Sequence, residues 1–350
     1  MAPTVLITGG AGYIGSHTAL EMLNAGYNVI CIDNMCNAYS EGKDAMPEAL
    51  KRVQKITGKT LTFHQVDITN GESLKAVFKK HKIDMVAHFA ALKAVGESCR
   101  YPLQYYQNNM TGTNMLLEAM AENKVFKFVY SSSATVYGEP QFLPITEKHP
   151  TGNCTSPYGK TKYFTEEILK DLCTSDDRWA VVSLRYFNPV GAHPSGNIGE
   201  DPNGEPNNLM PYIAQVAVGR RPLLKVYGTD FPTTDGTGVR DYIHIVDLAE
   251  GHVKALDKLK NDNETGFFAY NLGTGVGCSV LELVKAFEEA SGKPINRELV
   301  PRRPGDVATS FADASLATKA LGWKAKLGIK EMCEDTWRWQ SNNPKGYASK

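Results

Sequence analysis

The sequence predicts an α/β fold, in which a doubly wound parallel sheet is combined with a smaller mixed α/β lobe. Short apolar, β-branched runs recur along the first half, beginning at Thr4–Thr8, as expected for buried parallel strands. Helical patterns alternate with these runs, which is typical of parallel sheets. After Arg185 the composition changes, because the segment from Asn188 to Asp241 is rich in Pro, Gly and Asn. Long irregular segments of this kind usually carry function or connect domains.

Composition limits the classes of function. The 350 residues contain 38 Lys+Arg and 38 Asp+Glu, so no overall charge attracts nucleic acid or a membrane surface. Seven scattered cysteines form no C-x-x-C pair and no metal-ligand spacing, which predicts a reduced, cytoplasmic protein without a metal site. The chain enters a strand almost at once and has no apolar run long enough to cross a bilayer. We therefore expect neither a signal peptide nor a membrane segment.

The first strand leads directly into a glycine-rich turn. Gly9, Gly12 and Gly15 follow it with G-x-x-G-x-x-G spacing, and a helical pattern continues to about Ala25. Glycines at these positions let the backbone turn tightly and approach a pyrophosphate at a helix N-terminus. The next strand, Val29–Ile32, is followed by Asp33, whose carboxylate suits the two ribose hydroxyls of NAD and would repel a 2′-phosphate. Together these features predict an NAD-binding, Rossmann-type domain.

The alternation continues along the chain. Further strands are predicted at Thr60–Val66, Asp84–Phe89, Phe128–Tyr130, Val181–Leu184 and Phe267–Leu272. Helices are predicted at Leu103–Asn123, Ser279–Ser291, Ala314–Leu321 and Lys330–Gln340. Asp67-Ile68 and Ala90–Lys93 follow strand ends, where open α/β sheets bind their ligands. His88, inside an apolar run, is expected to be a hydrogen-bonded core residue rather than a catalyst.

The chemical centre is predicted in two segments. Ser156-Pro157 begins a helix on which Tyr158 and Lys162 lie four residues apart, on the same face. A nearby ammonium favours the phenolate and would make the tyrosine a usable base. Three serines, Ser131–Ser133, end the preceding strand, and Ser133 is the favoured catalytic one. An ordinary amphipathic helix, and serines that only satisfy nearby backbone groups, remain the alternatives.

The Pro/Gly/Asn-rich segment contains the chemistry of a nucleotide pocket. Amides at Asn207 and Asn208, an aromatic ring at Tyr227 and a cation at Arg240 suit the polar edges, base face and phosphates of a nucleotide. The run Arg302–Asp306 adds a second cation for a diphosphate and a carboxylate for a ribose.

These segments resemble the extended short-chain dehydrogenase/reductase family and, within it, the UDP-glucose (UDP-galactose) 4-epimerases. The similarity extends along nearly the whole chain, and its motifs are ITGGAGYIGSH at 7–17, SSSATVYG at 131–138, SPYGKTK at 156–162, RYFNPVGAHPSG at 185–196, NNLMPY at 207–212, DGTGVRDYIHIVDLA at 235–249 and RRPGD at 302–306. The first and third motifs are shared by the superfamily, and the others are more specific to the epimerases.

The resemblance implies reversible C4 epimerisation of UDP-galactose and UDP-glucose through a 4-keto sugar, with NAD retained by the enzyme. Tyr158 would take the proton from the 4-hydroxyl, Ser133 would hydrogen-bond the same oxygen, and Lys162 would lower the tyrosine pKa and contact the nicotinamide ribose. The keto sugar would then swing about its pyrophosphate and receive the hydride on its other face. The family also implies a homodimer paired through helices that include the one carrying Tyr158.

Matching positions extend the expected sites. Those implied for NAD are Gly9, Gly12, Tyr13, Ile14, Gly15, Asp33, Asn34, Asn37, Asp67, Ile68, Phe89, Lys93, Tyr158, Lys162 and Tyr186. Those implied for the UDP-sugar are Lys93, Asn109, Ser133, Tyr158, Phe187, Asn188, Asn207, Asn208, Leu209, Lys225, Val226, Tyr227, Arg240, Arg303, Asp306 and Ser310. Ser310 stands where members restricted to unmodified hexoses carry a bulky aromatic, so UDP-GalNAc and UDP-GlcNAc are expected substrates as well. The expected domains are an NAD-binding one at 1–187, with a return segment near 240–272, and a UDP-sugar-binding lobe at 188–350.

Three other functions share this framework. A nucleotide-sugar 4,6-dehydratase would need an Asp-Glu pair directly after the catalytic serine position, where this chain has Ala134 and Thr135. A dehydrogenase that releases NADH is disfavoured by the epimerase-specific motifs. A non-catalytic NAD-binding protein would be expected to lack the tyrosine or the lysine, and both are present. Fold alone does not decide among them.

Overall fold

The computed structural model describes residues 2–42, 45–262, 264–303 and 305–348, so Pro304 of the predicted RRPGD motif lies outside the described residues. The chain forms two compact units. The first comprises Met1–Gly138, Pro150–Tyr186 and Ala249–Tyr270, and the second comprises Glu139–His149, Phe187–Leu248 and Asn271–Lys350. The main division falls one residue before the expected one. The return segment is shorter than 240–272, and the excursion of Glu139–His149 into the second unit was not expected.

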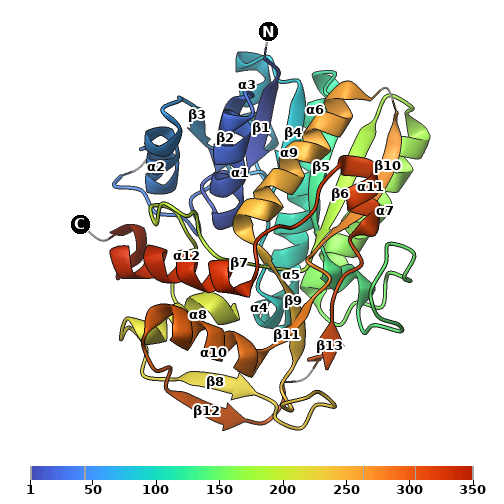
Figure 1. Ribbon diagram of the computed structural model, residues 1–350. Helices are drawn as coiled ribbons and strands as arrows, with labels where there is room; N and C mark the ends of the chain where they lie inside the picture. Colours follow the sequence, from blue (N-terminus) through green and yellow to red (C-terminus); the bar gives the residue numbers. More distant parts are fainter. Residues whose placement is uncertain (1, 43–44, 263, 304, 349–350) are drawn as a thin grey trace. The chain divides into compact units, whose positions relative to one another are not determined.

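The first unit is built on a seven-stranded sheet (Figure 1). Its strands are β1 (Thr4–Thr8), β2 (Asn28–Asp33), β3 (Thr62–Gln65), β4 (Met85–His88), β5 (Lys127–Ser133), β6 (Ala180–Tyr186) and β10 (Gly266–Leu272), in the order β10-β6-β5-β4-β1-β2-β3. The pairs from β3 to β6 are parallel. Because the chain first adds strands on one side of β1 and then on the other, the carboxyl ends of β1 and β4 form the switch point where such sheets bind ligands.

Helices cover both faces of this sheet. They are α1 (Tyr13–Asn24), α2 (Glu48–Thr57), α3 (Gly71–Lys80), α4 (Val95–Arg100), α5 (Pro102–Tyr106), the π-helical η1 (Gln107–Thr111), α6 (Gly112–Glu122), the 3₁₀ turn η2 (Ala134–Tyr137), α7 (Pro157–Ser175) and most of α9 (Ile245–Asn261). Figure 1 shows α1 and α9 in front of the strands. Apolar residues of α3, α6 and α7, such as Phe78, Met120 and Leu169, form one buried cluster with the sheet.

The predicted strands of this unit are confirmed, with ends that differ by up to three residues. The largest change is in β5, which continues through all three serines to Ser133. The helix expected at Leu103–Asn123 is present, but η1 interrupts it with a π-helical turn that carries Asn109. Such turns are frequent at functional sites. His88 is confirmed as a core residue, because it is buried and its two ring nitrogens lie 2.6 Å and 2.9 Å from the hydroxyls of Thr8 and Thr113.

The second unit is a smaller mixed structure centred on strand β9 (Val239–His244). Its other elements are β7 (Asn188–Val190), α8 (Leu209–Ala217), β8 (Leu224–Tyr227), β11 (Gly277–Ser279), α10 (Val280–Ser291), β12 (Arg297–Val300), β13 (Thr309–Ser310), α11 (Ser315–Leu321), α12 (Ile329–Asn342) and the 3₁₀ turn η3 (Gly346–Ala348). Strand β9 pairs with β7, β11 and β13, while β8 pairs with β12. Helices α8, α10 and α12 supply the core, which includes Met210, Phe287 and Met332.

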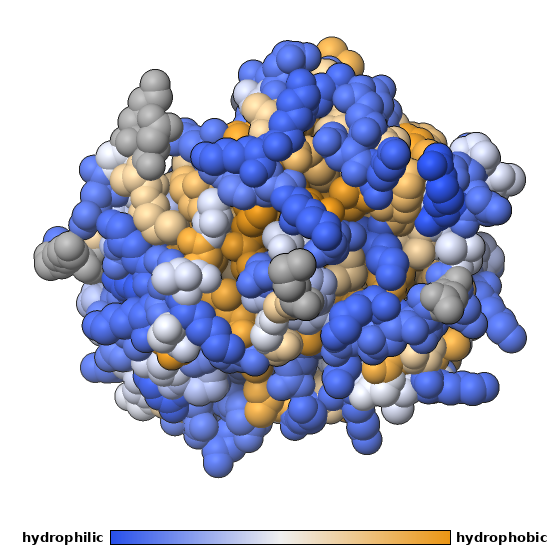
Figure 2. Space-filling view, turned by 90° about the horizontal axis from the view of Figure 1, so that it is seen from above, coloured by the Kyte–Doolittle hydropathy of each residue, from blue (hydrophilic) through white to orange (hydrophobic). Residues whose placement is uncertain are grey.

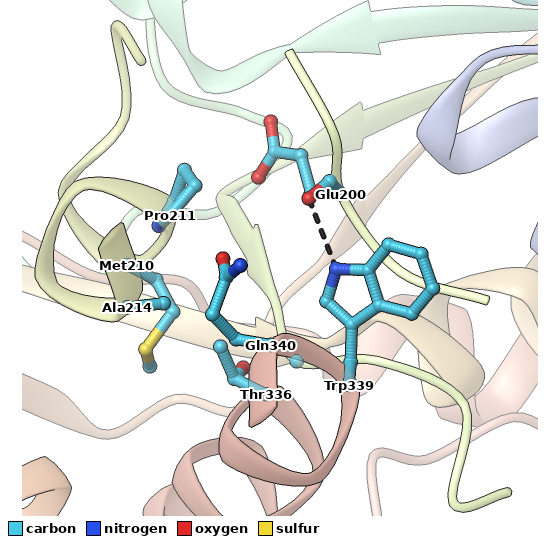
Figure 3. Close-up of a pocket in the computed structure, with 8 residues that line it drawn as sticks. Glu200, Met210, Pro211, Ala214, Thr336, Trp339 and Gln340 are labelled. Atoms are coloured by element: carbon cyan, nitrogen blue, oxygen red, sulfur yellow. Dashed lines mark hydrogen bonds between the residues drawn. The ribbon is translucent and has the colours of Figure 1, made fainter. Parts of the chain in front are cut away.

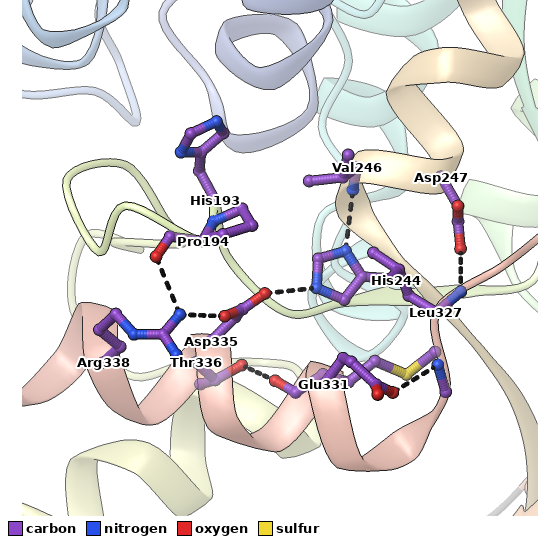
Figure 4. Close-up of polar contacts among 12 residues, drawn as sticks. His193, Pro194, His244, Val246, Asp247, Leu327, Glu331, Asp335, Thr336 and Arg338 are labelled. Atoms are coloured by element: carbon purple, nitrogen blue, oxygen red, sulfur yellow. Dashed lines mark hydrogen bonds and ion pairs between the residues drawn. The ribbon is translucent and has the colours of Figure 1, made fainter. Parts of the chain in front are cut away.

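A polar network fixes α12 to the end of β9 (Figure 4). His244 is fully buried, its Nδ1 accepts a hydrogen bond from Val246 N, and its Nε2 lies 3.3 Å from Asp335. Arg338 bonds the same carboxylate and donates to Pro194 O at 2.8 Å. Burial raises the pKa of Asp335, but His244 and Arg338 outweigh it and hold this pKa below its usual value. These contacts give His244 a structural role.

Helices α8 and α12 also enclose a small cavity, lined by Met210, Ala214, Thr336 and Gln340 among others (Figure 3). Trp339 closes one side and donates from Nε1 to Glu200 O at 3.2 Å. The cavity measures about 10 Å³, which is room for one water molecule at most. It is therefore too small to hold a nucleotide or a sugar.

The surface agrees with the balanced composition. Figure 2 shows one face of the molecule, on which hydrophilic residues predominate and apolar ones appear between them. Among the described residues, none of the helices combines the length and the apolar character that crossing a bilayer requires.

Candidate functional site

The glycine turn joins β1 to α1 and has little room for side chains. Gly9 has φ +67°, and a Cβ on it would lie 2.7 Å from Ala90 N. A Cβ on Gly15 would lie 2.1 Å from Gly9 O, so the first turn of α1 packs directly on the loop. Gly12 is the N-cap of α1 and has no side chain to cover the amides that follow. The turn is therefore open to a ligand that brings its own negative charge to the helix N-terminus.

Two carboxylates lie at the ends of the neighbouring strands β2 and β3, and the first of them contacts this turn. Asp33 ends β2 and accepts hydrogen bonds from Ala11 N at 3.1 Å and Met35 N at 2.9 Å. Burial raises the pKa of this carboxyl group, while these two bonds lower it. Asp67 follows β3 and accepts from Asn34 Nδ2 and from the amide and hydroxyl of Thr69. Burial alone would raise the Asp67 pKa, but these hydrogen bonds outweigh it, and the pKa lies below its usual value.

Lys93 lies exposed in the loop after β4, between two anchored residues. The Asn109 amide bonds both the N–H and the carbonyl of Leu92, at 2.8 Å and 2.9 Å. The Tyr105 hydroxyl lies 3.0 Å and 2.9 Å from the amide nitrogen and carbonyl oxygen of Ala94. Asn109 also donates to Thr161 on α7, so it connects the loop with the helix of Tyr158 and Lys162. Its expected contact with substrate stays a prediction, and its amide serves a bracing role within the protein.

The three predicted catalytic residues meet at the carboxyl end of β5. Ser156 caps α7 by accepting from Gly159 N, with Pro157 in the first turn, as the sequence predicted. Tyr158 lies close enough to Ser133 for the serine hydroxyl to lower its pKa. The Nζ of Lys162 donates to Ser131 O at 2.6 Å and lies 5.9 Å from the centre of the Tyr158 ring. A hydroxyl, a phenol and an amine are thus grouped as proton transfer at a sugar hydroxyl requires.

Burial dominates the ionisation of this group. It raises the pKa of Tyr158 to about 12, although the Ser133 hydrogen bond lowers it. It also lowers the pKa of Lys162 to about 7, against the opposing charge of Glu166. The sequence predicts that Lys162 brings the pKa of Tyr158 toward neutral pH. The protein's own residues do not have this effect. The reason is that an amine with a pKa of about 7 is mostly uncharged at the higher pH where this phenol would ionise, so Lys162 brings little positive charge to the phenolate.

The other positions expected for NAD lie around the same sheet edge. Tyr186 ends β6 and is buried, with its hydroxyl 2.5 Å from His252 Nε2 on α9. The ring of Phe89 meets His252 edge-on. Ile68 is buried against Gly112, so its side chain belongs to the core. Tyr13, Ile14 and Asn37 lie on α1 and in the loop after β2, as their sequence positions require.

In the second unit, β9 brings several predicted UDP-binding residues together. Arg240 is partly buried, and its Nη1 donates to Val239 O at 2.9 Å. Burial lowers its pKa. Ser310 on β13 pairs in register with Arg240, so it lies on the neighbouring strand. On the other side, Asn188 of β7 donates to Asp241 O at 2.9 Å. The three candidates are thus held by one sheet.

A second group lies between β8 and the segment before β13. The Arg303 guanidinium is 4.7 Å from the centre of the Tyr227 ring, and its Nε donates to Asp306 at 3.0 Å. Tyr227 is 37% exposed, so part of the ring is available to a ligand. A cation, a carboxylate and an exposed aromatic face in one place suit a nucleotide.

The remaining expected residues differ in what they offer. Asn208 is the N-cap of α8 and donates to Glu200 at 3.3 Å, while Asn207 before it is exposed and Leu209 begins the helix. In β8 the side chains alternate, so that Lys225 is exposed and Val226 is buried in the core. Phe187 is buried, and its amide donates to Leu272 O. Contacts of Val226 and Phe187 with a ligand would have to use their backbone or edge atoms.

Comparison with known proteins agrees with this arrangement. Residues 6–336 match the family described as GDP-mannose 4,6 dehydratase. The chain is 81% identical to UDP-glucose 4-epimerase of Drosophila melanogaster over 348 residues, which is 99% of each chain. The chain belongs to the UDP-glucose 4-epimerase family. The structure of UDP-glucose 4-epimerase from Bifidobacterium longum in complex with NAD⁺ and UDP has the same fold, with 53% identity and a TM-score of 0.93 over 98% of this chain and 99% of that one. The UDP-Glc/GlcNAc 4-epimerase from Campylobacter jejuni is also similar, with 34% identity and a TM-score of 0.81 over 97% of this chain and 100% of that one.

The fit of this epimerase-family chain to NAD can be judged on its own residues. Gly9 and Gly15 leave a space that any Cβ would fill. This space lies at the first turn of α1, where no N-cap side chain bonds the backbone amides. Asp33 stands beside that space through its bond to Ala11 N. A pyrophosphate and a ribose diol match this combination of amides and carboxylate. These residues therefore fit the dinucleotide.

Sequence reasoning missed one pair in this site. Glu166 is fully buried on α7 and forms an ion pair with Arg185 on β6 at 2.6 Å. The spacing held a signal, because residues 158, 162 and 166 follow at intervals of four and therefore share one helix face. Because Glu166 is acidic and lies on the same helix face as Tyr158 and Lys162, a buried cationic partner could have been expected.

Proposed function

We propose that this protein interconverts UDP-galactose and UDP-glucose by epimerisation at C4 of the sugar, using bound NAD. The observation that carries the proposal is the Ser133–Tyr158–Lys162 group at the end of β5, in a chain that also provides a dinucleotide turn and a UDP-type anchor. The similarity to UDP-glucose 4-epimerases over the full chain supports it.

The protein's own residues supply the proton chemistry. Tyr158, as phenolate, accepts the proton of the sugar 4-hydroxyl, and Ser133 donates a hydrogen bond to the same oxygen. NAD⁺ supplies the hydride acceptor and a positive charge that favours the phenolate. Since burial alone raises the Tyr158 pKa to about 12, a charge brought by the ligand is an effective way to make the base usable. Lys162, fixed by Ser131 O, keeps its amine beside the ring throughout.

The residues that bind UDP must hold it firmly, whereas the space around the sugar must let the sugar turn. For the hydride to return to the opposite face, the 4-keto sugar must turn while the UDP part stays in place. Arg240 and Arg303 are suited to the diphosphate, and Asp306 and the Tyr227 face are suited to ribose and base. A small side chain at Ser310 next to Arg240 leaves room beside the sugar. The N-acetylated substrates UDP-GalNAc and UDP-GlcNAc therefore belong to the proposed range. The C. jejuni relative is described as a UDP-Glc/GlcNAc 4-epimerase, which supports acceptance of an N-acetylated sugar.

The decisive test is an NMR time course of the purified protein with UDP-galactose and no added cofactor. We expect an approach to a UDP-glucose/UDP-galactose mixture, and the same with UDP-GalNAc as substrate. A 4-keto-6-deoxy product would instead establish a dehydratase, the activity after which the matching family is described. Ala134 and Thr135, in place of the acid-base pair that elimination needs, favour epimerisation. Absence of any turnover, with NAD⁺ added as well, would refute both reactions.

We also propose that the protein is a cytoplasmic homodimer. Several apolar side chains of α4, α7 and the α4–α5 segment of the first unit are exposed, namely Val95 (46%), Tyr101 (58%), Leu103 (81%) and Phe164 (40%). Apolar exposure on neighbouring helices is typical of an interface. All seven cysteines are free thiols, which supports a reducing compartment. Light scattering of the native protein and of Leu103→Asp tests the dimer: we expect twice the chain mass for the first and the single mass for the second.

A further inference from the structure

The end of β5 and the catalytic helix meet through three successive strand residues. Lys162 donates to Ser131 O, Ser132 donates to Glu166, and the Ser133 hydroxyl lies close enough to Tyr158 to lower its pKa. On α7 these partners are spaced by four residues and share one face. A shift of the helix by one residue would break all three contacts at once. The relative position of Ser133 and Tyr158 is therefore coupled to the contact made by Glu166.

Glu166 is the most strongly held member of this set. Its carboxylate accepts from Ser132 at 2.6 Å, from Ser183 at 2.8 Å, and from Nε and Nη2 of Arg185 at 3.0 Å and 2.6 Å. The carboxylate is fully buried and the guanidinium almost so. Arg185 continues to the Tyr137 hydroxyl at 3.0 Å. Helix α7, strands β5 and β6 and turn η2 are thus joined through one fork-shaped, charge-assisted contact.

The same pair determines the charge that surrounds the catalytic amine. Glu166 lies one helical turn from Lys162 and, without Arg185, would be the natural partner of that ammonium. Titratable groups that face α7 from other segments include His88 on β4, Tyr105 on α5, Tyr130 on β5, Tyr137 on η2, Tyr186 on β6 and Cys154. Lys160, Tyr163, Glu167, Lys170, Asp171 and Cys173 lie on α7 itself. Burial lowers the pKa of His88 to about 3, and raises that of Cys154 to about 11 and those of Tyr105, Tyr130 and Tyr186. The charges joined by these contacts are therefore Lys162, Glu166 and Arg185.

We propose that Glu166 and Arg185 are positioning residues of the epimerase reaction: the pair fixes α7 against β5 and β6, and Arg185 keeps the Glu166 charge from capturing Lys162. The inference rests on the proposed function. Glu166 lies about 12 Å along the helix from Tyr158, given a rise of about 1.5 Å per residue, and the Arg185 guanidinium on β6 touches its carboxylate. Each single neutral variant therefore leaves one uncompensated charge near that position. At an effective dielectric constant of about 20, such a charge changes the tyrosine pKa by about one unit.

The test compares the pH dependence of kcat for Glu166→Gln, Arg185→Gln and the double variant. Glu166→Gln leaves a positive charge that favours the phenolate, so the acidic limb of the pH profile of kcat should move to a lower pH by about one unit. Arg185→Gln leaves a negative charge, so the limb should move up by about as much. The double variant restores the balance, and its limb should lie within about half a unit of that of the unaltered protein. Arg178→Gln removes a surface partner of Asp176 beyond the other end of α7 and should change nothing.

Opposite shifts that cancel in the double variant would establish the role. Losses of kcat without such shifts, or shifts in the same direction, would overturn it, because a merely structural pair would weaken the site without this pattern. An unpaired buried charge can prevent folding. The neutral double variant avoids this problem. A second readout is the phenolate absorbance of each protein, from which the absorbance of its Tyr158→Phe counterpart is subtracted. That absorbance measures Tyr158 directly, so if the unaltered protein shows no epimerisation, the proposed function fails while this inference is still decided.

Discussion

Lys162→Met should stabilise the cofactor-free protein near neutral pH. Burial lowers the Lys162 pKa from 10.5 to about 7, so between these values the unfolded chain binds a proton that the folded protein does not hold. The free energy of unfolding of the unaltered protein therefore rises with pH across this range. Below pH 7 the lysine is protonated in both states, and the fold carries the full cost of the buried charge. The advantage of Met is therefore largest there and disappears as the pH passes about 10.5.

The expected size follows from the shift. Roughly three units at 1.36 kcal/mol each give about 4–5 kcal/mol as an upper bound. Methionine loses the bond to Ser131 O, at about 1 kcal/mol, and the contact with the Tyr130 ring, which lies 4.9 Å from Nζ, at about 1 kcal/mol. We expect a net gain of about 2–3 kcal/mol at pH 6. Stability and activity would then oppose each other at this residue, as is common for catalytic groups.

The assay is urea denaturation of nucleotide-stripped protein at pH 6 and pH 10.5, with Lys160→Met as the matched control. Lys160 lies on the same helix and is exposed, so its replacement should change stability little at either pH. A variant at Lys162 that is equally stable or less stable than the unaltered protein at pH 6 would refute the reasoning. So would a gain that persists unchanged at pH 10.5, because it would then come from packing rather than from charge.

Three further variants test other parts of the site. Gly9→Ala places a Cβ 2.7 Å from Ala90 N at φ +67°, so the purified protein should lose its bound NAD, measured by absorbance after denaturation. Tyr158→Phe should lower kcat by about 100-fold or more while the Kd for UDP, measured by calorimetry, stays within about twofold. Asp241→Asn puts an amide against donors from Thr274, Gly275 and Ala312, which should cost about 2–4 kcal/mol in urea denaturation, whereas the exposed Asp230→Asn should cost less than about 1 kcal/mol.

The first unit was largely predictable because its signals are local. A buried parallel strand must be apolar along its length, so β1 and β6 could be read directly, and the glycine turn has few alternative explanations. Strand β5 was predicted too short, because Ser131–Ser133 are polar. Their hydroxyl and carbonyl groups are nevertheless compatible with a strand, since α7 supplies a partner for each of the three.

The second unit was less predictable for a physical reason. Strands β7 and β13 have three and two residues, too few for any periodic pattern, and they are fixed by pairing with β9. The register that places Ser310 beside Arg240 is a long-range property of this kind. Buried partners such as Glu166 and Arg185, which are 19 residues apart, likewise become recognisable only when the fold brings them together.

The two predicted phosphate-binding arginines should not contribute equally. Arg240 is held by Val239 O and is partly buried, so folding has already ordered it and removed part of its hydration. Arg303 has a side chain that is 56% exposed and paired with Asp306, a surface contact worth about 0–1 kcal/mol. Ordering a long side chain on binding costs about 1–2 kcal/mol, which Arg240 avoids. Arg240→Gln should therefore raise the Kd for UDP about tenfold more than Arg303→Gln in calorimetry. Equal losses would mean that exposure in the free protein does not measure the cost of ordering Arg303.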